Sequence, residues 1–296
     1  MLRLLVIVVL WLSLSFAQAV AAESRLSVAP YLGVYRPGLG DLVDKEFKAP
    51  VAGIVDVIDI TGSTVRSQVL FPNPLPKLGL GANAGLEFLW KLSDKYEFIV
   101  GGGTWEAYSR ALAEGGFYLQ GEASDVVNER TAKVSYNEFY FGFKYNLLRS
   151  PKKYKAYYRL TLNEIFDIDY REDLIFLFTS GVAEGVKKSM ILESQATGLM
   201  MLQPGFGLDY FVRDWLSFGF DVSYMIGFKR VNLGNGTSKV DFLSTDAVSI
   251  WLPQRVDPVT GNLQYLSQNP VDENDYSPIK LSFDGWKSSF KMNIYF

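Results

Sequence analysis

The feature that most constrains the fold is a two-residue alternation of apolar and polar side chains. Over residues 196–212, the even positions are mostly apolar, among them Met200, Phe206 and Leu208, and the odd positions include Gln203 and Asp209. After Arg213–Asp214, the same alternation resumes over 216–228. A period of two is that of a β-strand, so the two runs predict a hairpin. Each run is about twice as long as a typical strand of a soluble sandwich and is long enough to cross a bilayer when tilted.

The alternation recurs along the chain, which predicts an all-β fold built from eight strands. Three connections between them are short, and four are long and polar, as in outer-membrane barrels with short periplasmic turns and long extracellular loops. We therefore predict an eight-stranded antiparallel transmembrane β-barrel. The expected strands are about 26–35, 78–90, 96–109, 133–147, 154–170, 196–212, 215–230 and 281–296, and the expected long loops are about 36–77, 111–132, 171–195 and 232–280.

The segment 53–71 leaves a choice between eight and ten strands. It could form a hairpin inside the first long loop, or it could add two spanning strands. Asp56 and Asp59 would lie on opposite faces of a strand, so neither face would suit lipid. We therefore favour the loop hairpin and keep ten strands as the alternative.

The first residues have the pattern of a secretory signal peptide. Arg3 precedes an apolar run from Leu4 to about Phe16, and small residues follow at Ala19-Val20-Ala21. The run is shorter than the roughly 18 to 20 residues of a spanning helix. We predict a signal peptide over 1–21 and a single barrel domain over 22–296, exported to the outer membrane. The absence of cysteine agrees with a bacterial envelope protein rather than a disulfide-rich secreted domain.

These segments resemble the small bacterial outer-membrane barrels, the group of OmpA-, OmpX- and OmpW-type proteins. The last residues, "FKMNIYF", carry Phe290, Met292, Ile294 and Phe296 on one face of the final strand. In that group, a last strand ending in an aromatic residue is thought to be read by the barrel assembly machinery. The resemblance therefore implies that these four residues form the assembly signal, and that the assembly machinery and outer-membrane lipid are partners.

Composition argues against most enzymatic and nucleic-acid functions. The chain has no histidine and no cysteine, so the usual general base, the Ser–His–Asp and Cys–His arrangements and the common zinc sites are missing. Its formal net charge of −3 gives no general attraction to nucleic acid. We expect no enzymatic activity, no cofactor, no bound metal and no nucleic-acid partner.

The polar face of the alternation also predicts a group of charges inside the barrel. These residues lie a few positions from the expected periplasmic turns, so they should share the lower half of the lumen: Glu87, Lys144, Arg159, Asp209, Asp221 and Lys291. One interpretation is a salt-bridge network that fills a narrow lumen. The other is a gate or a proton-coupled path. We favour the filling network.

The long loops should carry what specificity the protein has. Asp272, Glu273 and Asp275 could bind a divalent cation or bridge through one to lipopolysaccharide phosphates, although a solvated loop explains them as well. The pattern of residues 255–266 predicts a surface hairpin. The apolar segment 173–186 could form a helix over the barrel mouth or a patch for a hydrophobic ligand or partner, or it could pack against the other loops, which we favour. We predict a structural or surface-interaction role with contacts to lipopolysaccharide. The alternative is a narrow channel or transporter for small or hydrophobic molecules.

Overall fold

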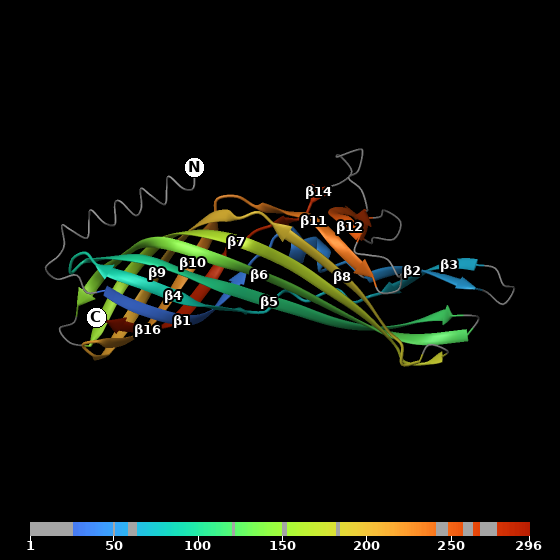
Figure 1. Ribbon diagram of the computed structural model, residues 1–296, viewed down its shortest axis with the longest axis horizontal. Coiled ribbons are helices and arrows are strands. Elements are labelled where there is room, and N and C mark those ends of the chain that lie inside the picture. Colours follow the sequence, from blue (N-terminus) through green and yellow to red (C-terminus); the bar gives the residue numbers. More distant parts are fainter. Residues whose placement is uncertain are drawn as a thin grey trace.

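The computed structural model describes residues 26–49, 51–58, 64–119, 122–149, 153–181, 184–240, 248–256, 263–266 and 277–296. Within these ranges, eight antiparallel strands close a barrel (Figure 1). In ring order they are β1 (Leu26–Pro37), β4 (Gly81–Lys91), β5 (Tyr96–Leu119), β6 (Glu122–Arg149), β7 (Tyr154–Phe178), β9 (Leu199–Arg213), β10 (Leu216–Gly227) and β16 (Gly285–Tyr295). Each overlaps one of the eight segments expected from the alternation, although β4, β9, β10 and β16 begin or end up to four residues inside the expected bounds.

Pairing of the first and last strands closes the ring. Val28 lies opposite Ile294 and Tyr31 opposite Lys291, and the amide of Phe296 donates a 2.9 Å hydrogen bond to the carbonyl of Leu26. The other seam joins β7 to β9, so no strand of the ring has a free edge along the barrel wall. A closed ring satisfies the backbone groups internally, as a spanning β-structure must.

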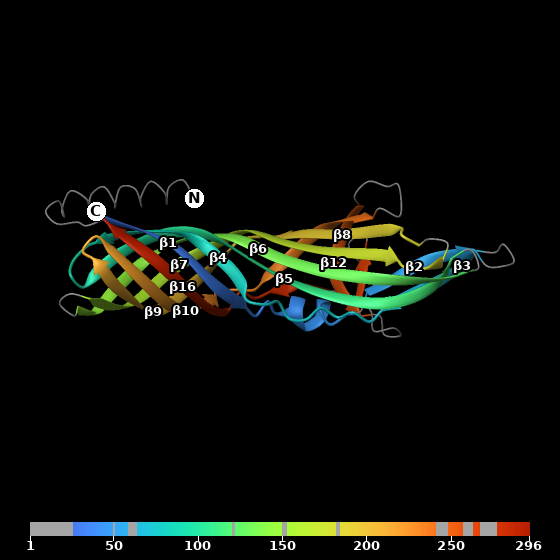
Figure 2. The same cartoon turned by 90° about the horizontal axis from the view of Figure 1, so that it is seen from below.

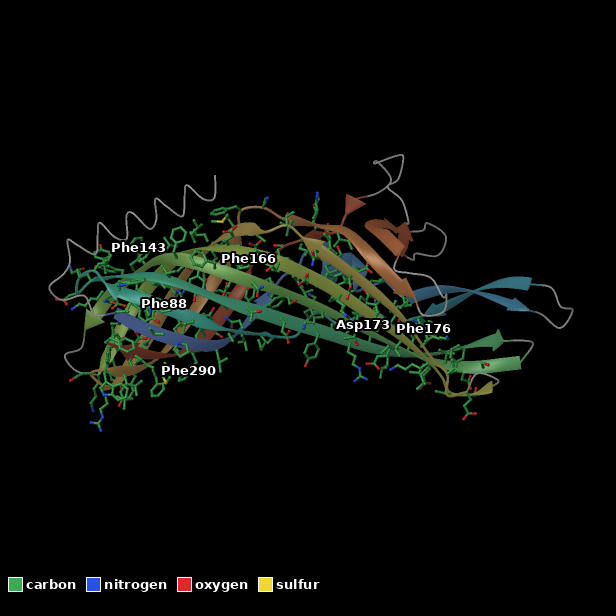
Figure 3. All side chains as sticks on the ribbon, in the orientation of Figure 1. Phe88, Phe143, Phe166, Asp173, Phe176 and Phe290 are labelled. Carbon is green, nitrogen blue, oxygen red and sulfur yellow. The ribbon has the colours of Figure 1, made fainter. Side chains whose placement is uncertain are left out.

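The expected division into an outer and an inner face is confirmed in these strands. Large apolar side chains point away from the barrel, among them Phe88, Phe143, Phe166 and Phe290 (Figure 3). Positions between them point into the barrel and are buried, so each strand shows the two-residue burial pattern that its sequence predicts.

Two expected long loops, 111–132 and 171–195, are largely strands instead. β5 runs to Leu119 and β6 starts at Glu122, while β7 runs to Phe178 and β8 (Lys187–Ala196) returns beside it. These strands extend the barrel wall far beyond its ring as a long curved sheet (Figures 1 and 2). The described residues of segment 173–186 are therefore the end of β7 and part of a turn rather than a helix. Polar residues made these segments look like loops, but a sheet exposed to water needs no apolar outer face.

The expected loop 232–280 also contributes to this sheet. β11 (Val231–Val240) pairs with β8, and β12 (Val248–Val256) pairs with β11. β12 and β13 (Leu263–Leu266) pair with Arg255 opposite Gln264, so the surface hairpin predicted over 255–266 is present in its strands. Short strands β14 (Ser277–Pro278) and β15 (Lys280–Leu281) pair with β12 and β11. We call the part of β5, β6, β7, β8, β11 and β12 outside the ring the platform.

The first expected loop, 36–77, has two parts. β2 (Val51–Ile58) and β3 (Thr64–Phe71) pair with each other in a separate two-stranded sheet, which confirms eight barrel strands rather than ten. The rest of this loop folds over the barrel mouth, where the π-helical turn η1 (Leu42–Glu46) lies against the inner face of the wall.

An apolar cluster fills the mouth of the barrel beneath this segment, and we call it the mouth cluster. Leu42 and Phe47 from the loop pack against inward side chains of the wall such as Trp105 and Met225. The full set of buried members is Tyr35, Leu39, Leu42, Val43, Phe47, Leu75, Leu78, Trp105, Ala107, Ala132, Val134, Tyr136, Ile165, Ile168, Tyr170, Leu192, Leu199, Met201, Met225, Val231, Leu233, Ile279, Leu281 and Phe283.

Candidate functional site in the barrel lumen

Four of the six predicted lumen charges form a closed ring of ion pairs. The Nη1 atom of Arg159 lies 2.9 Å from Glu87 and 3.0 Å from Asp221. The Nζ atom of Lys291 lies 2.6 Å from Glu87 and 2.5 Å from Asp221. All four residues are at least 96 % buried. Two cations therefore neutralise two carboxylates, and each cation contacts both. We call these residues the lumen ring.

Four different strands supply the lumen ring, because alternate positions of every strand face inward. Glu87 comes from β4, Arg159 from β7, Asp221 from β10 and Lys291 from β16. The strands that carry Glu87 and Arg159 are three places apart in the ring of eight strands. The ring of ion pairs thus bridges the lumen rather than lining one wall.

Tyrosine rings pack around these charges over glycines on the neighbouring strands. Tyr31 lies opposite Gly85, and Tyr157 lies opposite Gly207. A β-carbon at either glycine would collide with the tyrosine ring beside it. The glycines therefore make room for the aromatic side chains that fill the lumen between the charges.

The other two predicted lumen charges, Lys144 and Asp209, do not contact the lumen ring within ion-pair distance. Lys144 is fully buried and lies 4.3 Å from the centre of the Tyr157 ring, and it has no ion pair within 4.0 Å among the described residues. Lys144 therefore shares the lumen with the predicted acids but lies over an aromatic ring rather than within ion-pair distance of a described carboxylate. Asp209 lies 3.5 Å from Lys155 and accepts a 3.2 Å hydrogen bond from Asn293.

Two further buried ion pairs in the lumen were not among the predicted residues. Lys155 lies 2.8 Å from Glu97 near the short turns, and Lys287 pairs with Glu138 closer to the mouth. All four side chains are buried. Lys155 and Lys287 lie two alternation steps from Arg159 and Lys291, and Glu138 lies three steps from Lys144, so extending the alternation along these strands would have found them. Glu97 lies on β5, which supplied no predicted charge.

Between the ion pairs and the mouth cluster, uncharged polar side chains complete the filling. Asn163 donates hydrogen bonds of 2.9 Å to Gln203 and 3.4 Å to Glu138, and Gln203 donates one of 2.7 Å to Ser223. An eight-stranded barrel is only wide enough inside for side chains. Ion pairs below, amides in the middle and apolar groups at the mouth occupy this space in succession.

The outer surface divides into an apolar band and a polar platform. Phe143 and Phe290 are more than half exposed on the outside of the barrel, as are Leu32, Tyr158 and Phe220. Water disfavours a continuous exposed surface of this kind, whereas a lipid bilayer covers it. Above Phe139 on β6, the outward positions become Asn137, Ser135 and Lys133, which suit water.

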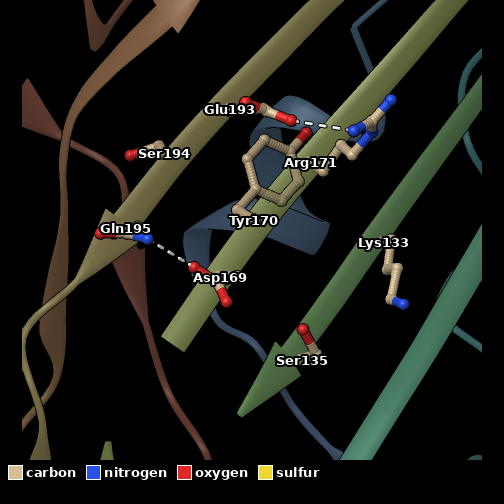
Figure 4. A pocket seen from close by; sticks show the side chains of 8 residues that line it. All are labelled: Lys133, Ser135, Asp169, Tyr170, Arg171, Glu193, Ser194 and Gln195. Atoms are coloured by element: carbon tan, nitrogen blue, oxygen red, sulfur yellow. Dashed lines mark hydrogen bonds and ion pairs between the residues drawn. The ribbon is translucent and has the colours of Figure 1, made fainter. Parts of the chain in front are cut away.

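A groove on the outer face of the platform lies just above this change. It has a volume of about 490 Å³ and is lined by Lys133, Ser135, Asp169, Tyr170, Arg171, Glu193, Ser194 and Gln195 (Figure 4). Arg171 contacts Asp173 and lies 2.9 Å from Glu193, and the hydrogen bonds of Arg171 to Asp173 raise the pKa of the guanidinium above its usual value. Since Arg171 is paired with these acids and Lys133 lies 2.7 Å from Glu106, the groove is a polar surface whose two cations are both paired.

The residues of the predicted assembly signal lie on the outer face of the last strand. Phe290 and Phe296 are exposed, and Met292 and Ile294 are partly exposed between them. Their role in assembly stays a prediction. The predicted signal peptide and the acidic residues Asp272, Glu273 and Asp275 lie outside the described residues.

Two kinds of feature are absent from the described residues. None of their helices is long and apolar enough to span a membrane. None of their acidic side chains form a group of three that could hold a metal ion.

Comparison with known proteins gives no family assignment. No protein-family model matches the chain, and no curated protein matches it significantly. Among solved structures, it is similar to an outer-membrane channel of the COG4313 type from Pseudomonas putida F1, with 7 % identity, a TM-score of 0.23, and 92 % of this chain and 95 % of that chain covered. A FadL homologue from Pseudomonas aeruginosa has 10 % identity, a TM-score of 0.21, and coverages of 92 % and 89 %. A deletion mutant of the monoaromatic hydrocarbon channel TodX has 9 % identity, a TM-score of 0.15, and coverages of 92 % and 90 %.

Proposed function

We propose that the protein is a bacterial outer-membrane barrel that is closed along its axis and holds the platform on the cell surface as an interaction surface. The observation that carries this proposal is the lumen ring, because Arg159 and Lys291 bridge acids on strands that are three places apart in the barrel wall. Buried ion pairs exclude a water-filled path while they remain intact. The closed lumen supports a structural role over an aqueous pore.

The platform supports the second half of the proposal. It continues the barrel wall without a flexible connection, since β5, β6 and β7 run through both regions as single strands. Sites carried on regular strands are held more rigidly than sites on loops. A rigid sheet rising from a closed barrel suits contacts with lipopolysaccharide or another envelope component.

The absence of cysteine gives a direct test of this orientation. In otherwise cysteine-free chains, Ala123→Cys lies on the platform and Asp214→Cys lies in a short turn at the opposite end. A membrane-impermeant maleimide added to intact cells should label Ala123→Cys and spare Asp214→Cys, and both should react after lysis. Equal labelling of the two in intact cells, or recovery of the protein in the soluble periplasm, would contradict the proposal.

A second candidate function is a lateral route for small apolar molecules, and an interruption in the wall favours it. β7 pairs with β9 as far as Ile165 and with β8 from Ile168, which leaves Phe166 and Asp167 between the two ladders. Asp167 has a positive φ of 50°. Ile165 and Ile168 belong to the mouth cluster, whereas Phe166 faces outward. An apolar interior thus meets the outer surface at a break in the hydrogen bonding.

Uptake measurements separate the two candidates. Cells that produce the protein should accumulate an apolar dye faster than a deletion strain if the lateral route operates, and Ile168→Asp should abolish the difference. A closed structural barrel gives equal uptake in all three strains. Outer-membrane amounts of the variant must be matched before the rates are compared.

A further inference from the structure

The cations just above the apolar band differ between the two sides of the barrel. On the side of β5, β6 and β7, they are paired with acids across neighbouring strands. Arg110 lies 2.6 Å from Glu129, and Lys133 lies 2.7 Å from Glu106. Arg171 is paired as described above. This side offers little uncompensated positive charge to a ligand.

On the opposite side, exposed cations stand without acidic partners. They are Arg36 at the end of β1, Lys229 and Arg230 between β10 and β11, and Lys280 on β15. None of the four forms an ion pair within 4.0 Å with another described residue. We call these four residues the basic rim.

Strand register places the basic rim along one stretch of the barrel mouth. Arg36 lies opposite Trp286, and Lys280 lies opposite Asn232, two residues beyond Arg230. Two described acids lie in this region: Asp41, next to the Gly40 that approaches the Lys280 carbonyl, and Asp284, on the connection between these two pairs. The carboxylate of Asp284 accepts hydrogen bonds from the amide of Gly227 at 2.6 Å and from Ser282 at 2.8 Å. Against the four cations of the basic rim, these two carboxylates leave a net positive charge among the described residues of this region.

Beside and below the basic rim, the outer surface is strongly apolar, with Trp286 next to Arg36 on the neighbouring strand and Leu32 four residues further down β1. Trp286 is 64 % exposed, Phe228 is 63 % exposed, and Leu32 lies two positions below Val34 on β1 with 69 % exposure. Unpaired cations therefore stand beside and above side chains that suit acyl chains. Aromatic and basic residues are the side chains that favour such an interface.

We propose that the basic rim and the apolar side chains beside and below it bind lipopolysaccharide through the phosphates and acyl chains of its lipid A. This inference rests on the outer-membrane location of the proposed function and assigns one lipid to one side of the barrel. Lipid A carries two phosphates on a sugar core above several acyl chains. The phosphates of lipid A would face the cations of the basic rim, and its acyl chains would face the apolar side chains of the barrel. Arg recognises phosphate oxygens through paired hydrogen bonds, and Lys adds point charge.

Matched triple variants of the full chain test the assignment. The rim variant is Arg36→Gln/Arg230→Gln/Lys280→Gln, and the control is Arg110→Gln/Lys133→Gln/Arg171→Gln. Each removes two arginines and one lysine just outside the apolar band, so the change in net charge is the same. Native mass spectrometry of the detergent-solubilised barrels, titrated with purified diphosphoryl lipid A in EDTA, gives the affinities. Phosphatidylglycerol and monophosphoryl lipid A serve as comparison lipids.

A cation near an anionic lipid surface contributes about fivefold in affinity, so the rim variant should bind lipid A about 100-fold more weakly. The control variant should change little, and the unaltered protein should prefer diphosphoryl lipid A to both comparison lipids. Equal losses in the two variants, an unchanged rim variant, or equal binding of phosphatidylglycerol would overturn the inference. Suppose that one of these contradicting results is obtained with barrels that keep their heat-dependent gel shift and carry no current. The lipid A inference then fails, and the proposed closed barrel stands. Loss of outer-membrane location in the unaltered protein removes the proposed function as well.

Discussion

Replacing Arg159 with alanine removes one of the two cations that neutralise Glu87 and Asp221 in the lumen ring. Arg159 lies 2.9 Å and 3.0 Å from these acids, and all three side chains are buried. After the substitution, Lys291 must serve two buried carboxylates alone. Breaking a buried ion pair by removing one partner costs on the order of 3 to 5 kcal/mol, because the remaining charge stays buried without compensation.

The geometry places the expected loss for Arg159→Ala near the lower end of that range. Lys291 still contacts both acids, at 2.6 Å and 2.5 Å, so neither becomes wholly unpaired. We expect the free energy of unfolding to fall by about 3 kcal/mol. Neutralising one acid in the same chain should recover part of this loss, since one lysine and one carboxylate then remain. Asp221→Asn and Glu87→Gln should both act in this way, with a coupling energy of about 1 to 3 kcal/mol in each double-mutant cycle.

Urea unfolding of the refolded barrel in lipid vesicles, followed by tryptophan fluorescence, measures these differences. Arg171→Ala is the matched control, because it removes an arginine paired with two acids on the exposed platform. Exposed pairs contribute about 1 kcal/mol or less. The reasoning fails if Arg159→Ala costs no more than Arg171→Ala, or if neither double mutant recovers stability. Either result would mean that water reaches and screens the lumen charges.

Three further substitutions test other parts of the structure. Phe296→Asp should block assembly in the outer membrane while synthesis and export continue, and normal amounts of heat-modifiable barrel would contradict the assembly signal. Arg130→Met removes the buried guanidinium that donates to the carbonyls of Glu46 and Ala49, so residues 38–49 should become accessible to protease; unchanged digestion would show that the mouth cluster alone holds them. Gly207→Ala should destabilise the barrel by about 1 to 3 kcal/mol, because its β-carbon meets the Tyr157 ring, whereas Gly79→Ala meets nothing and should be neutral. Equal stability of the two glycine variants would refute the packing argument.

The barrel could be predicted from the sequence because lipid imposes a rule on every spanning strand. Residues such as Phe139 and Phe141 must face outward, and the positions between them must face inward, so the eight strands and their faces followed. The platform could not be predicted in the same way. Above Asn137, water replaces lipid, and the outward residues of β6 lose the apolar signal although the strand continues to Glu122.

The contacts among the lumen charges could not be predicted from the sequence either. Alternation gives the face on which a residue lies but not its height relative to residues of distant strands. Arg159 of β7 and Asp221 of β10 come together although β9 lies between their strands, and Lys144 lies over the Tyr157 ring. Those choices depend on strand stagger and on the glycines that let aromatic rings enter the lumen, neither of which a single strand reveals.

The closed lumen is tested most directly by planar-bilayer recording of the purified, unaltered protein. Ion pairs from Lys155 and Glu97 up to Lys287 and Glu138 cross the barrel, and the mouth cluster lies beyond them. We therefore predict no steady current at moderate voltage and neutral pH from bilayers that contain the correctly folded, heat-modifiable barrel. Reproducible single-channel steps of one size, present in the unaltered protein and absent from mock preparations, would contradict the closed-barrel account.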